Sequence, residues 1–165
     1  KTYRIYESKK PLHVEKAPEW LAHHDYVLNQ SMVASFAVNN TVMVSWTNMA
    51  TLDFALNWVH HCRKAGMHNF LVGAMDGKAL AALVKAGVPT FSMSSIHKGE
   101  EHSWEKRHDG DLGRHDKFHQ MGREKIQLIH TFVHLGYDLV LTDVDTVWLR
   151  DPLPFFWRYP EADIL

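Results

Sequence analysis

Residues 139–149 read Leu-Val-Leu-Thr-Asp-Val-Asp-Thr-Val-Trp-Leu, a short apolar run that ends in two carboxylates one residue apart. Four to five residues without a polar break predict a strand that is buried on both faces, inside a parallel sheet and next to the first strand of the chain. Asp143 and Asp145 come where this strand should end, and ligands of open α/β sheets gather at the carboxyl ends of the strands. If the chain stays extended through both residues, their carboxylates point to the same side.

Two carboxylates held this close predict a site for a hard divalent cation, Mn²⁺ or Mg²⁺, that also carries diphosphate and water. The alternative is a solvated turn, because Asp-x-Asp also follows hydrophobic runs by chance. The next residues, Thr-Val-Trp-Leu-Arg-Asp-Pro-Leu-Pro at 146–154, do not relax into a polar loop. A carboxylate pair between two apolar segments costs desolvation unless a cation binds it, so the flanks favour the metal site.

The composition is that of a globular protein. The chain has 165 residues, of which 45% are hydrophobic, and this length suffices for one domain with a sizeable core. A net charge of −1 argues against nucleic acid or an anionic membrane surface as a general partner. Cys62 is the one cysteine and cannot form an internal disulfide. There is no signal peptide and no apolar stretch of membrane-spanning length, and the chain opens on Lys1 without Met, so we expect a segment of a longer protein.

Strands and helices alternate from residue 41 onward. We expect strands at 41–46, 70–75, 88–91 and before Asp143, and helices at 50–65, 78–86 and 119–135. The helices end at Gly66, Gly87 and Gly136, each close before a strand, as a tight connection requires. This alternation predicts right-handed crossovers and a mainly parallel sheet. The residues expected to align on the inner faces of these helices are Leu52, Ala55, Leu56, Val59 and Cys62; Leu80, Leu83 and Val84; and Ile126, Ile129 and Val133.

Two segments depart from this rhythm. Residues 1–38 are polar and mixed in charge, and we expect an N-terminal extension packed on the outside of the domain, with a short helix ending near residue 30. Residues 92–117 form a long, charged segment, which predicts a mobile flap near the ligand cleft. Its histidines lack the spacing of a metal site, so a solvated loop is favoured over histidine ligation for His97, His102, His108 and His115.

Several short motifs follow one another over residues 39–165. They are NNTVMVSW at 39–46, DF at 53–54 with WVHH at 58–61, NFLVGAMD at 69–76, MGREK at 121–125, and DVD at 143–145 with VWLRDP at 147–152. In order and spacing they resemble plant and green-algal nucleotide-sugar transferases of glycosyltransferase family 77, and the extensin arabinosyltransferases most of all.

The resemblance implies a GT-A fold, an α/β architecture with a Rossmann-like, mainly parallel sheet and helices on both faces. A donor half carrying Asp-x-Asp precedes an acceptor half in this family. Residues 39–165 would then be the donor half, truncated after the Asp-x-Asp strand, with the acceptor half and a further metal ligand beyond Leu165. We therefore expect exposed apolar surface near Phe155, Phe156 and Ile164.

The resemblance also implies roles for the metal-side residues. Asp145 would be the stronger direct metal ligand, and Asp143 would bridge the metal and the nucleotide ribose. Thr47 and Asn48 would line the nucleotide pocket. Trp148 is expected to pack in the core rather than to stack on a ligand. No nucleophile is assigned.

Three further residues have alternative roles. Asp76 is a candidate for the ribose or base, or for the N-cap of the helix that follows. Arg123 and Lys125 lie near the predicted start of the third helix, where they would reach the diphosphate or sugar and add to the positive helix end. Their alternative is a solvated first turn with Glu124.

By resemblance the activity is transfer of a pentose, arabinose first, from a UDP-sugar to a cell-wall glycoprotein glycan, with Mn²⁺ or Mg²⁺. The implied location is the Golgi lumen, with any membrane anchor outside this segment. Transfer of xylose to a pectic glycan is the nearest alternative. A non-catalytic fragment that binds a nucleotide or a protein is another.

A haloacid-dehalogenase-like phosphatase also remains open, because Asp-Val-Asp-Thr-Val fits its Asp-x-Asp-x-Thr/Val signature. There the first Asp accepts the phosphoryl group and the second is a general acid. That signature opens its domain, whereas several strand–helix units precede it here.

Overall fold

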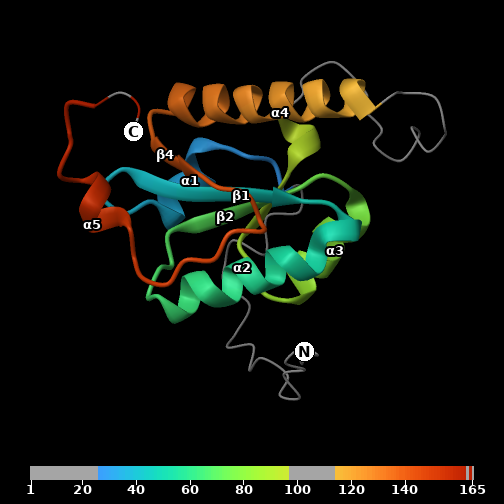
Figure 1. The fold of residues 1–165 in the computed structure, drawn as a ribbon, viewed down its shortest axis with the longest axis horizontal. Helices are drawn as coiled ribbons and strands as arrows, with labels where there is room; N and C mark the ends of the chain where they lie inside the picture. The colour runs from blue at the N-terminus through green and yellow to red at the C-terminus, as the bar shows by residue number, and fades with distance from the viewer. Residues whose placement is uncertain (1–25, 97–113, 163, 165) are drawn as a thin grey trace.

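A four-stranded parallel sheet forms the centre of the molecule (Figure 1). The strand order is β3-β2-β1-β4. The computed structural model describes residues 26–96, 114–162 and 164, with the backbone alone at 114–121. The strands are β1 (Thr41–Thr47), β2 (Phe70–Ala74), β3 (Thr90–Ser92) and β4 (Asp138–Leu141). The expected α/β fold with a parallel sheet is confirmed.

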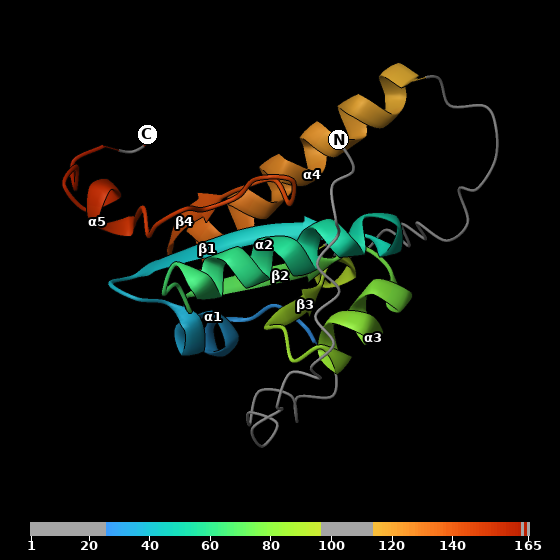
Figure 2. The ribbon, with the colours of Figure 1, turned by 60° about the horizontal axis from the view of Figure 1, so that its bottom comes forward.

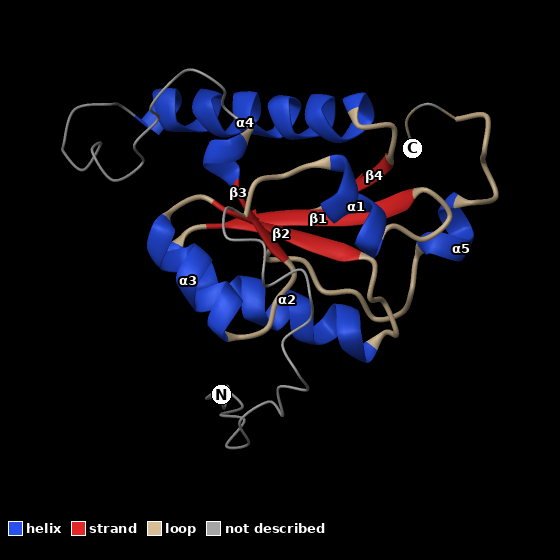
Figure 3. Ribbon diagram, turned by 180° about the vertical axis from the view of Figure 1, so that it is seen from behind, coloured by secondary structure: helices blue, strands red, loops and turns tan. Residues whose placement is uncertain are grey.

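Helices cover both faces of the sheet. One face packs against α2 (Leu52–Lys64), α3 (Gly77–Lys85) and α5 (Leu153–Phe156), and the other packs against α1 (Gln30–Phe36) and α4 (Arg114–His134). Two short 3-10 helices, η2 (Met49–Thr51) and η3 (Met93–Ser95), follow β1 and β3. Figure 2 brings α2 to the front of the sheet, and Figure 3 shows the molecule from behind, with α1 on the viewer's side.

The central strand β1 has every residue buried, because it pairs on both sides and is covered on both faces. Its side chains alternate between the two cores, as the pleat of a strand requires. Met43 joins the α2 side, while Val42, Val44 and Trp46 join the α4 side. A strand with this burial supports site residues at its carboxyl end on a rigid base.

The prediction that three helices end at glycine residues is confirmed. Gly66, Gly87 and Gly136 follow α2, α3 and α4 with φ values of +82°, +63° and +87°. This left-handed conformation is open to glycine without strain, which is why each helix can turn directly into the next strand.

The described part of the expected N-terminal extension belongs to the core. Asn29 caps α1 by accepting a 2.9 Å hydrogen bond from the Met32 amide, and Val33 is fully buried on the α4 side. The Tyr26 carbonyl accepts a 2.8 Å bond from the Ser92 amide at the end of β3. Leu28, Met32 and Val33 join this segment to the α4-side core, while most of its other residues are exposed. The division of the chain at residue 38 stays a prediction. The rest of the extension, and residues 97–113 of the expected flap, lie outside the described residues.

Helix α4 turns a different face to the sheet from the one predicted. Leu128 and Phe132 are fully buried, whereas Ile126, Ile129 and Val133 are 67%, 42% and 60% exposed. The helix carries apolar residues on two faces, and the spacing of apolar residues alone led to the wrong prediction of which face is buried. On α2 the prediction also missed the fully buried Trp58, and Leu56 is exposed instead.

Strand β4 lies next to β1, as predicted, but at the edge of the sheet in the described part of the chain. Its apolar residues, Leu139 to Leu141, are half-buried. The expectation of a strand between two others was therefore wrong. Val140 packs against the α2-side core, and Leu139 and Leu141 pack against the α4-side core. The apolar run therefore reflects packing on both faces and not a second partner strand.

After β4 the chain returns along the sheet. Trp148 packs against the α2-side core, as expected, and Leu153 of α5 is buried in it. The Trp157 indole then donates a 3.0 Å hydrogen bond to the Thr41 hydroxyl, at the opposite end of β1. Phe155 and Ile164 are 52% and 91% exposed, whereas Phe156 is half-buried against the core. No helix within the described ranges is long and apolar enough to cross a membrane.

Candidate functional site

The site lies at the carboxyl ends of β1 and β4, where the strand order reverses. From β1 the chain continues to β2 and β3 on one side, and it then crosses to β4 on the other. Ligands of parallel α/β sheets bind at such switch points, where the loops after two adjacent strands lead in opposite directions. Asn48 follows β1 and Asp143 follows β4, so the predicted residues of both loops lie at the same edge of the sheet.

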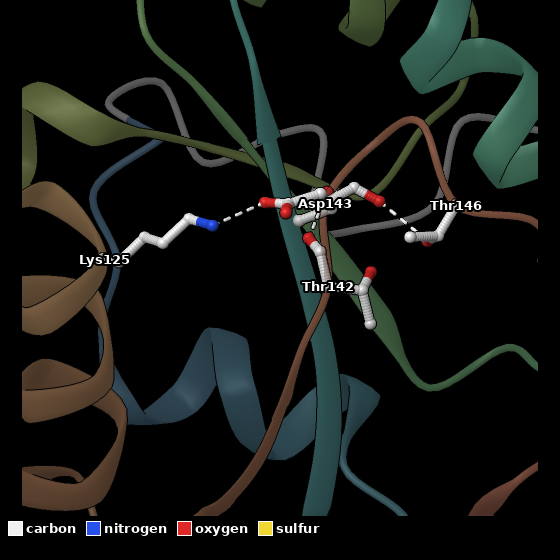
Figure 4. A network of polar contacts seen from close by, with 5 residues as sticks. Lys125, Thr142, Asp143 and Thr146 are labelled. Atoms are coloured by element: carbon white, nitrogen blue, oxygen red, sulfur yellow. Dashed lines mark hydrogen bonds and ion pairs between the residues drawn. The ribbon is translucent and has the colours of Figure 1, made fainter. Parts of the chain in front are cut away.

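The chain turns at Asp143 instead of staying extended (Figure 4). Pairing with β1 ends with the Thr142 amide, which donates a 3.0 Å bond to the Val44 carbonyl. The Asp143 carbonyl then accepts bonds from the Thr146 amide at 3.2 Å and the Thr146 hydroxyl at 2.7 Å. The chain is therefore not extended through both residues, and the expectation that an extended strand points both carboxylates to one side was wrong. Asp145 sits within this turn and is exposed.

The Asp143 carboxylate is held by Lys125 of α4. The Lys125 ammonium lies 2.8 Å from Asp143 Oδ1 (Figure 4) and 5.1 Å from the centroid of the Trp46 ring on β1. The ion pair neutralises one of the two predicted metal ligands, and the aromatic face attracts the same cation. The sequence led us to expect Lys125 at a diphosphate or sugar and did not predict either contact.

Ser45 fixes the backbone at the end of β4. This fully buried residue of β1 donates a 2.7 Å hydrogen bond from its hydroxyl to the Thr142 carbonyl. Sequence reasoning missed Ser45. The available signal was a hydroxyl inside an otherwise apolar strand, since a buried polar group needs a partner.

The two predicted residues after β1 serve the local fold. Thr47 is 1% exposed, and its hydroxyl lies 2.9 Å from that of Thr51. The Asn48 side-chain oxygen accepts hydrogen bonds from the amides of Ala50 at 2.9 Å and Thr51 at 3.1 Å, which caps η2. Their role in lining a nucleotide pocket stays a prediction.

Asp76 joins the loop after β2 to the loop after β1. Its Oδ1 accepts a 2.8 Å bond from the Ala79 amide, so the N-cap role is confirmed. Its Oδ2 accepts a 2.8 Å bond from the Met49 amide. A carboxylate has lone pairs beyond these two bonds, and contact with a ribose or base stays a prediction.

Arg123 is exposed on α4, two residues before Lys125. Residues two apart point to different sides of a helix, so the pair does not act on one ligand from one face. The helix begins at Arg114, about two and a half turns before Arg123. A contribution from the positive helix end is therefore wrong, because that field falls off within the first turn.

The donor set fits a divalent ion in kind but is incomplete. Asp143 and Asp145 supply carboxylate oxygens, and Mg²⁺ or Mn²⁺ takes one or two carboxylates together with phosphate oxygens and water. Across the described residues, no three His, Cys, Asp or Glu side chains come together to hold a metal. The remaining ligands would have to come from the substrate, water or other residues.

Comparisons with known proteins point to one class of enzyme. A family model described as nucleotide-diphospho-sugar transferase matches residues 65–165, which include Asp143 and Asp145. The curated relatives include Arabinosyltransferase XEG113 of Arabidopsis thaliana, 38% identical over 140 residues, covering 85% of this chain and 20% of the relative. Beta-arabinofuranosyltransferase RAY1 of the same plant is 29% identical over 121 residues, covering 73% and 21%.

A third relative, Arabinosyltransferase RRA2 of Arabidopsis thaliana, is 25% identical over 137 residues, covering 80% of this chain and 28% of the relative. The chain thus spans about a fifth of the length of the first two relatives. No solved structure gives a significant match.

Proposed function

The chain belongs to the nucleotide-diphospho-sugar transferase family, and from this premise we propose that it forms the donor-binding part of a metal-dependent arabinosyltransferase. The reaction would move arabinose from a UDP-sugar to a glycan of a cell-wall glycoprotein. The printed names of the relatives support the sugar. The single observation that carries the site is the position of Asp143 at the switch point between β1 and β4. Family membership favours this reaction over the phosphatase alternative.

We propose that Asp143 and Asp145 hold Mn²⁺ or Mg²⁺. When bound, the ion offsets the negative charge that develops on the diphosphate as the bond to the sugar breaks. Lys125 is 2.8 Å from Asp143 and therefore stands beside the same phosphates, where its ammonium would donate a charge-assisted hydrogen bond. Asn48 and Asp76, at the ends of the two neighbouring strands, would orient the nucleoside.

The wider setting is part of the same proposal. Residues 39–165 would supply the donor half, and residues 26–38 would contribute to its α4-side core. Residues outside this chain would bind the acceptor, and the Golgi lumen is the proposed location. A transferase must hold donor, metal and acceptor hydroxyl at near-attack distance, so we expect this chain alone to bind nucleotide but to transfer sugar poorly.

Calorimetric titration of UDP into the chain tests the donor site. We expect binding that requires Mn²⁺ or Mg²⁺ and disappears with a chelator, because carboxylates and diphosphate repel one another without a cation. Asp145→Asn should weaken metal-dependent binding at least about tenfold with an unchanged far-ultraviolet spectrum, since a ligating carboxylate is lost. UDP binding of equal strength with and without chelator would refute the metal assignment.

The sugar requires a separate experiment. A version of the protein extended beyond residue 165 should transfer pentose to hydroxyproline-linked arabinoside from UDP-arabinose, and faster than from UDP-xylose. Preference for UDP-xylose and a pectic acceptor would favour the xylosyltransferase alternative. Comparable turnover by the 165-residue chain would show that the acceptor site lies within these residues.

A further inference from the structure

Three elements converge on one cation at the site. Lys125 extends from α4, its ammonium reaches Asp143 Oδ1 at 2.8 Å beyond β4, and it lies over the Trp46 ring of β1. Trp46 is 7% exposed and packed in the α4-side core, so the ring is a fixed support. Lys125 and Asp143 have side chains that are 37% and 53% exposed. The aromatic part is therefore rigid, while the ion pair is open to solvent.

The ammonium and a metal ion compete for the same carboxylate. Lys125 uses lone pairs of Asp143 Oδ1, one of the oxygens that a divalent ion would need. Two cations bound to one carboxylate repel each other strongly at such a distance. A partly exposed ion pair contributes little free energy, so an ion of higher charge can displace the ammonium. A divalent ion at Asp143 would therefore bring a second positive charge beside the Lys125 ammonium, and their repulsion favours movement of Lys125.

Trp46 limits how far Lys125 moves. The ring attracts the ammonium by the cation–π interaction whether or not Asp143 is its partner. A displaced Lys125 would keep the Trp46 ring as a support, and the diphosphate of a bound nucleotide would offer it a new anionic partner.

We propose that Lys125 is an exchangeable counter-cation of Asp143. It holds the carboxylate before ligands bind, gives it up to the divalent ion, and passes to the nucleotide diphosphate with Trp46 as its support. This inference rests on the proposed function. Its consequence is that the binding of metal and the binding of nucleotide are coupled. The metal alone displaces the Lys125 ammonium and offers it no new partner, whereas the metal together with a nucleotide does.

The test compares Lys125→Met with the unmodified chain and with Lys85→Met, a matched control at an exposed position on α3. Methionine keeps the apolar stem and removes the charge. Free Mn²⁺ is counted by electron paramagnetic resonance, first without and then with UDP, and UDP binding is measured by calorimetry. Lys125→Met should bind Mn²⁺ alone about two- to fivefold more tightly, the range expected for loss of an exposed ion pair. It should bind UDP with Mn²⁺ about tenfold more weakly, since a charge-assisted contact to phosphate is lost.

Exchange predicts that Lys125→Met changes the two affinities in opposite directions, with tighter binding of Mn²⁺ alone and weaker binding of UDP with Mn²⁺. A purely structural role for Lys125 would lower both affinities or neither, and Lys85→Met should change neither. Lys125→Arg, which keeps the charge, should retain the coupling. If Lys125→Met binds Mn²⁺ no more tightly than the unmodified chain does, the exchange is overturned. If UDP binding of the unmodified chain still needs Mn²⁺ in that case, the proposed function stands. UDP binding that ignores Mn²⁺ in the unmodified chain overturns both.

Discussion

The hydroxyl of Ser45 donates a 2.7 Å hydrogen bond to the carbonyl of Thr142, one residue before Asp143. It joins β1 to the chain just past the end of β4, where the turn over residues 143–146 begins. The turn that presents Asp143 and Asp145 is therefore anchored from within the sheet, by a residue that would not itself touch a ligand.

Removing this anchor should loosen the site. We expect Ser45→Ala to lower the free energy of unfolding by about 1 kcal/mol, the net contribution of one buried hydrogen bond. It should also weaken Mn²⁺-dependent UDP binding several-fold, because the carboxylates lose their fixed position. Urea denaturation and calorimetry measure the two effects. The matched control is Thr90→Val, which removes a 2.6 Å bond to the Val72 carbonyl elsewhere in the sheet. Equal losses of UDP affinity in both variants would assign the effect to general stability.

Asp76 should be important for folding irrespective of any ligand. Asp76→Ala removes the acceptor for two amides, those of Ala79 and Met49, and should cost about 1–2 kcal/mol in the free energy of unfolding. Asp76→Asn keeps one side-chain oxygen as a cap and should cost less. The comparison variant, Asn29→Ala, loses a single capping bond at α1. An unfolding free energy for Asp76→Ala equal to that of the unmodified chain would contradict the double-acceptor role.

Cys62 should resist thiol reagents in the folded protein. Burial raises the pKa of the Cys62 thiol to about 12 from its ordinary value of 9.0, with Arg63 nearby opposing the rise. At pH 8 the thiol stays protonated, so reaction with an aromatic disulfide reagent should follow unfolding and accelerate in urea. Immediate reaction without urea would contradict this burial.

The same shift predicts a loss of stability at alkaline pH. The unfolded thiol ionises near 9.0 and the folded thiol near 12, so its contribution is fully present below pH 9 and is lost as pH rises toward 12. Urea denaturation at pH 8 and about 10.5 should show a smaller decline for Cys62→Ala than for the unmodified chain. Other groups that titrate in this range are common to both proteins. Identical declines would contradict the assignment.

Gly73 on β2 should not accept a side chain. A Cβ there would lie 2.6 Å from Met93 Sδ and 3.0 Å from Phe91 Cζ, so Gly73→Ala should cost about 1–3 kcal/mol of stability by overpacking. Gly122→Ala is the control, because nothing lies within 4 Å of a Cβ at Gly122 on α4, and alanine is the better helix former. Chemical denaturation should give opposite signs for the two variants. Destabilisation of similar size in both would refute the steric argument.

Local patterns predicted the fold well, because they depend on neighbours along the chain. Gly66, Gly87 and Gly136 end helices because of their own backbone freedom, and the alternation of elements then favours a parallel sheet. The burial of α4 could not be predicted in the same way. Leu128 and Ile126 are both apolar residues of one helix, and only the packed sheet decides which of them is buried.

The sequence predicted which residues belong to the candidate site but not which of them contact each other. The apolar run before Asp143 and Asp145 marked the end of a strand, which the structure confirms for Asp143. The turn is closed by bonds between Asp143 and Thr146, three residues apart, and the sequence offered it only as the alternative to an extended strand. The pairing with Lys125 joins the loop after β4 to α4, and no local pattern carries that information. Asp76 is instructive, since its cap role follows from local sequence while its bond to the Met49 amide does not.

The parallel pairing of β1 with β4 has a consequence for the order of folding. Ser45 and Thr142 are 97 residues apart, whereas the bond between Asn69 and Thr41 spans 28 residues and that between Thr90 and Val72 spans 18. Closing the longer loop loses more chain entropy, so we expect β1, β2 and β3 to associate first. During synthesis the candidate site cannot form until Thr142 has left the ribosome. Among the strand pairings of this sheet, the one beside the candidate nucleotide site is therefore expected to form last, and a slow folding step there would delay binding before it delayed the rest of the sheet.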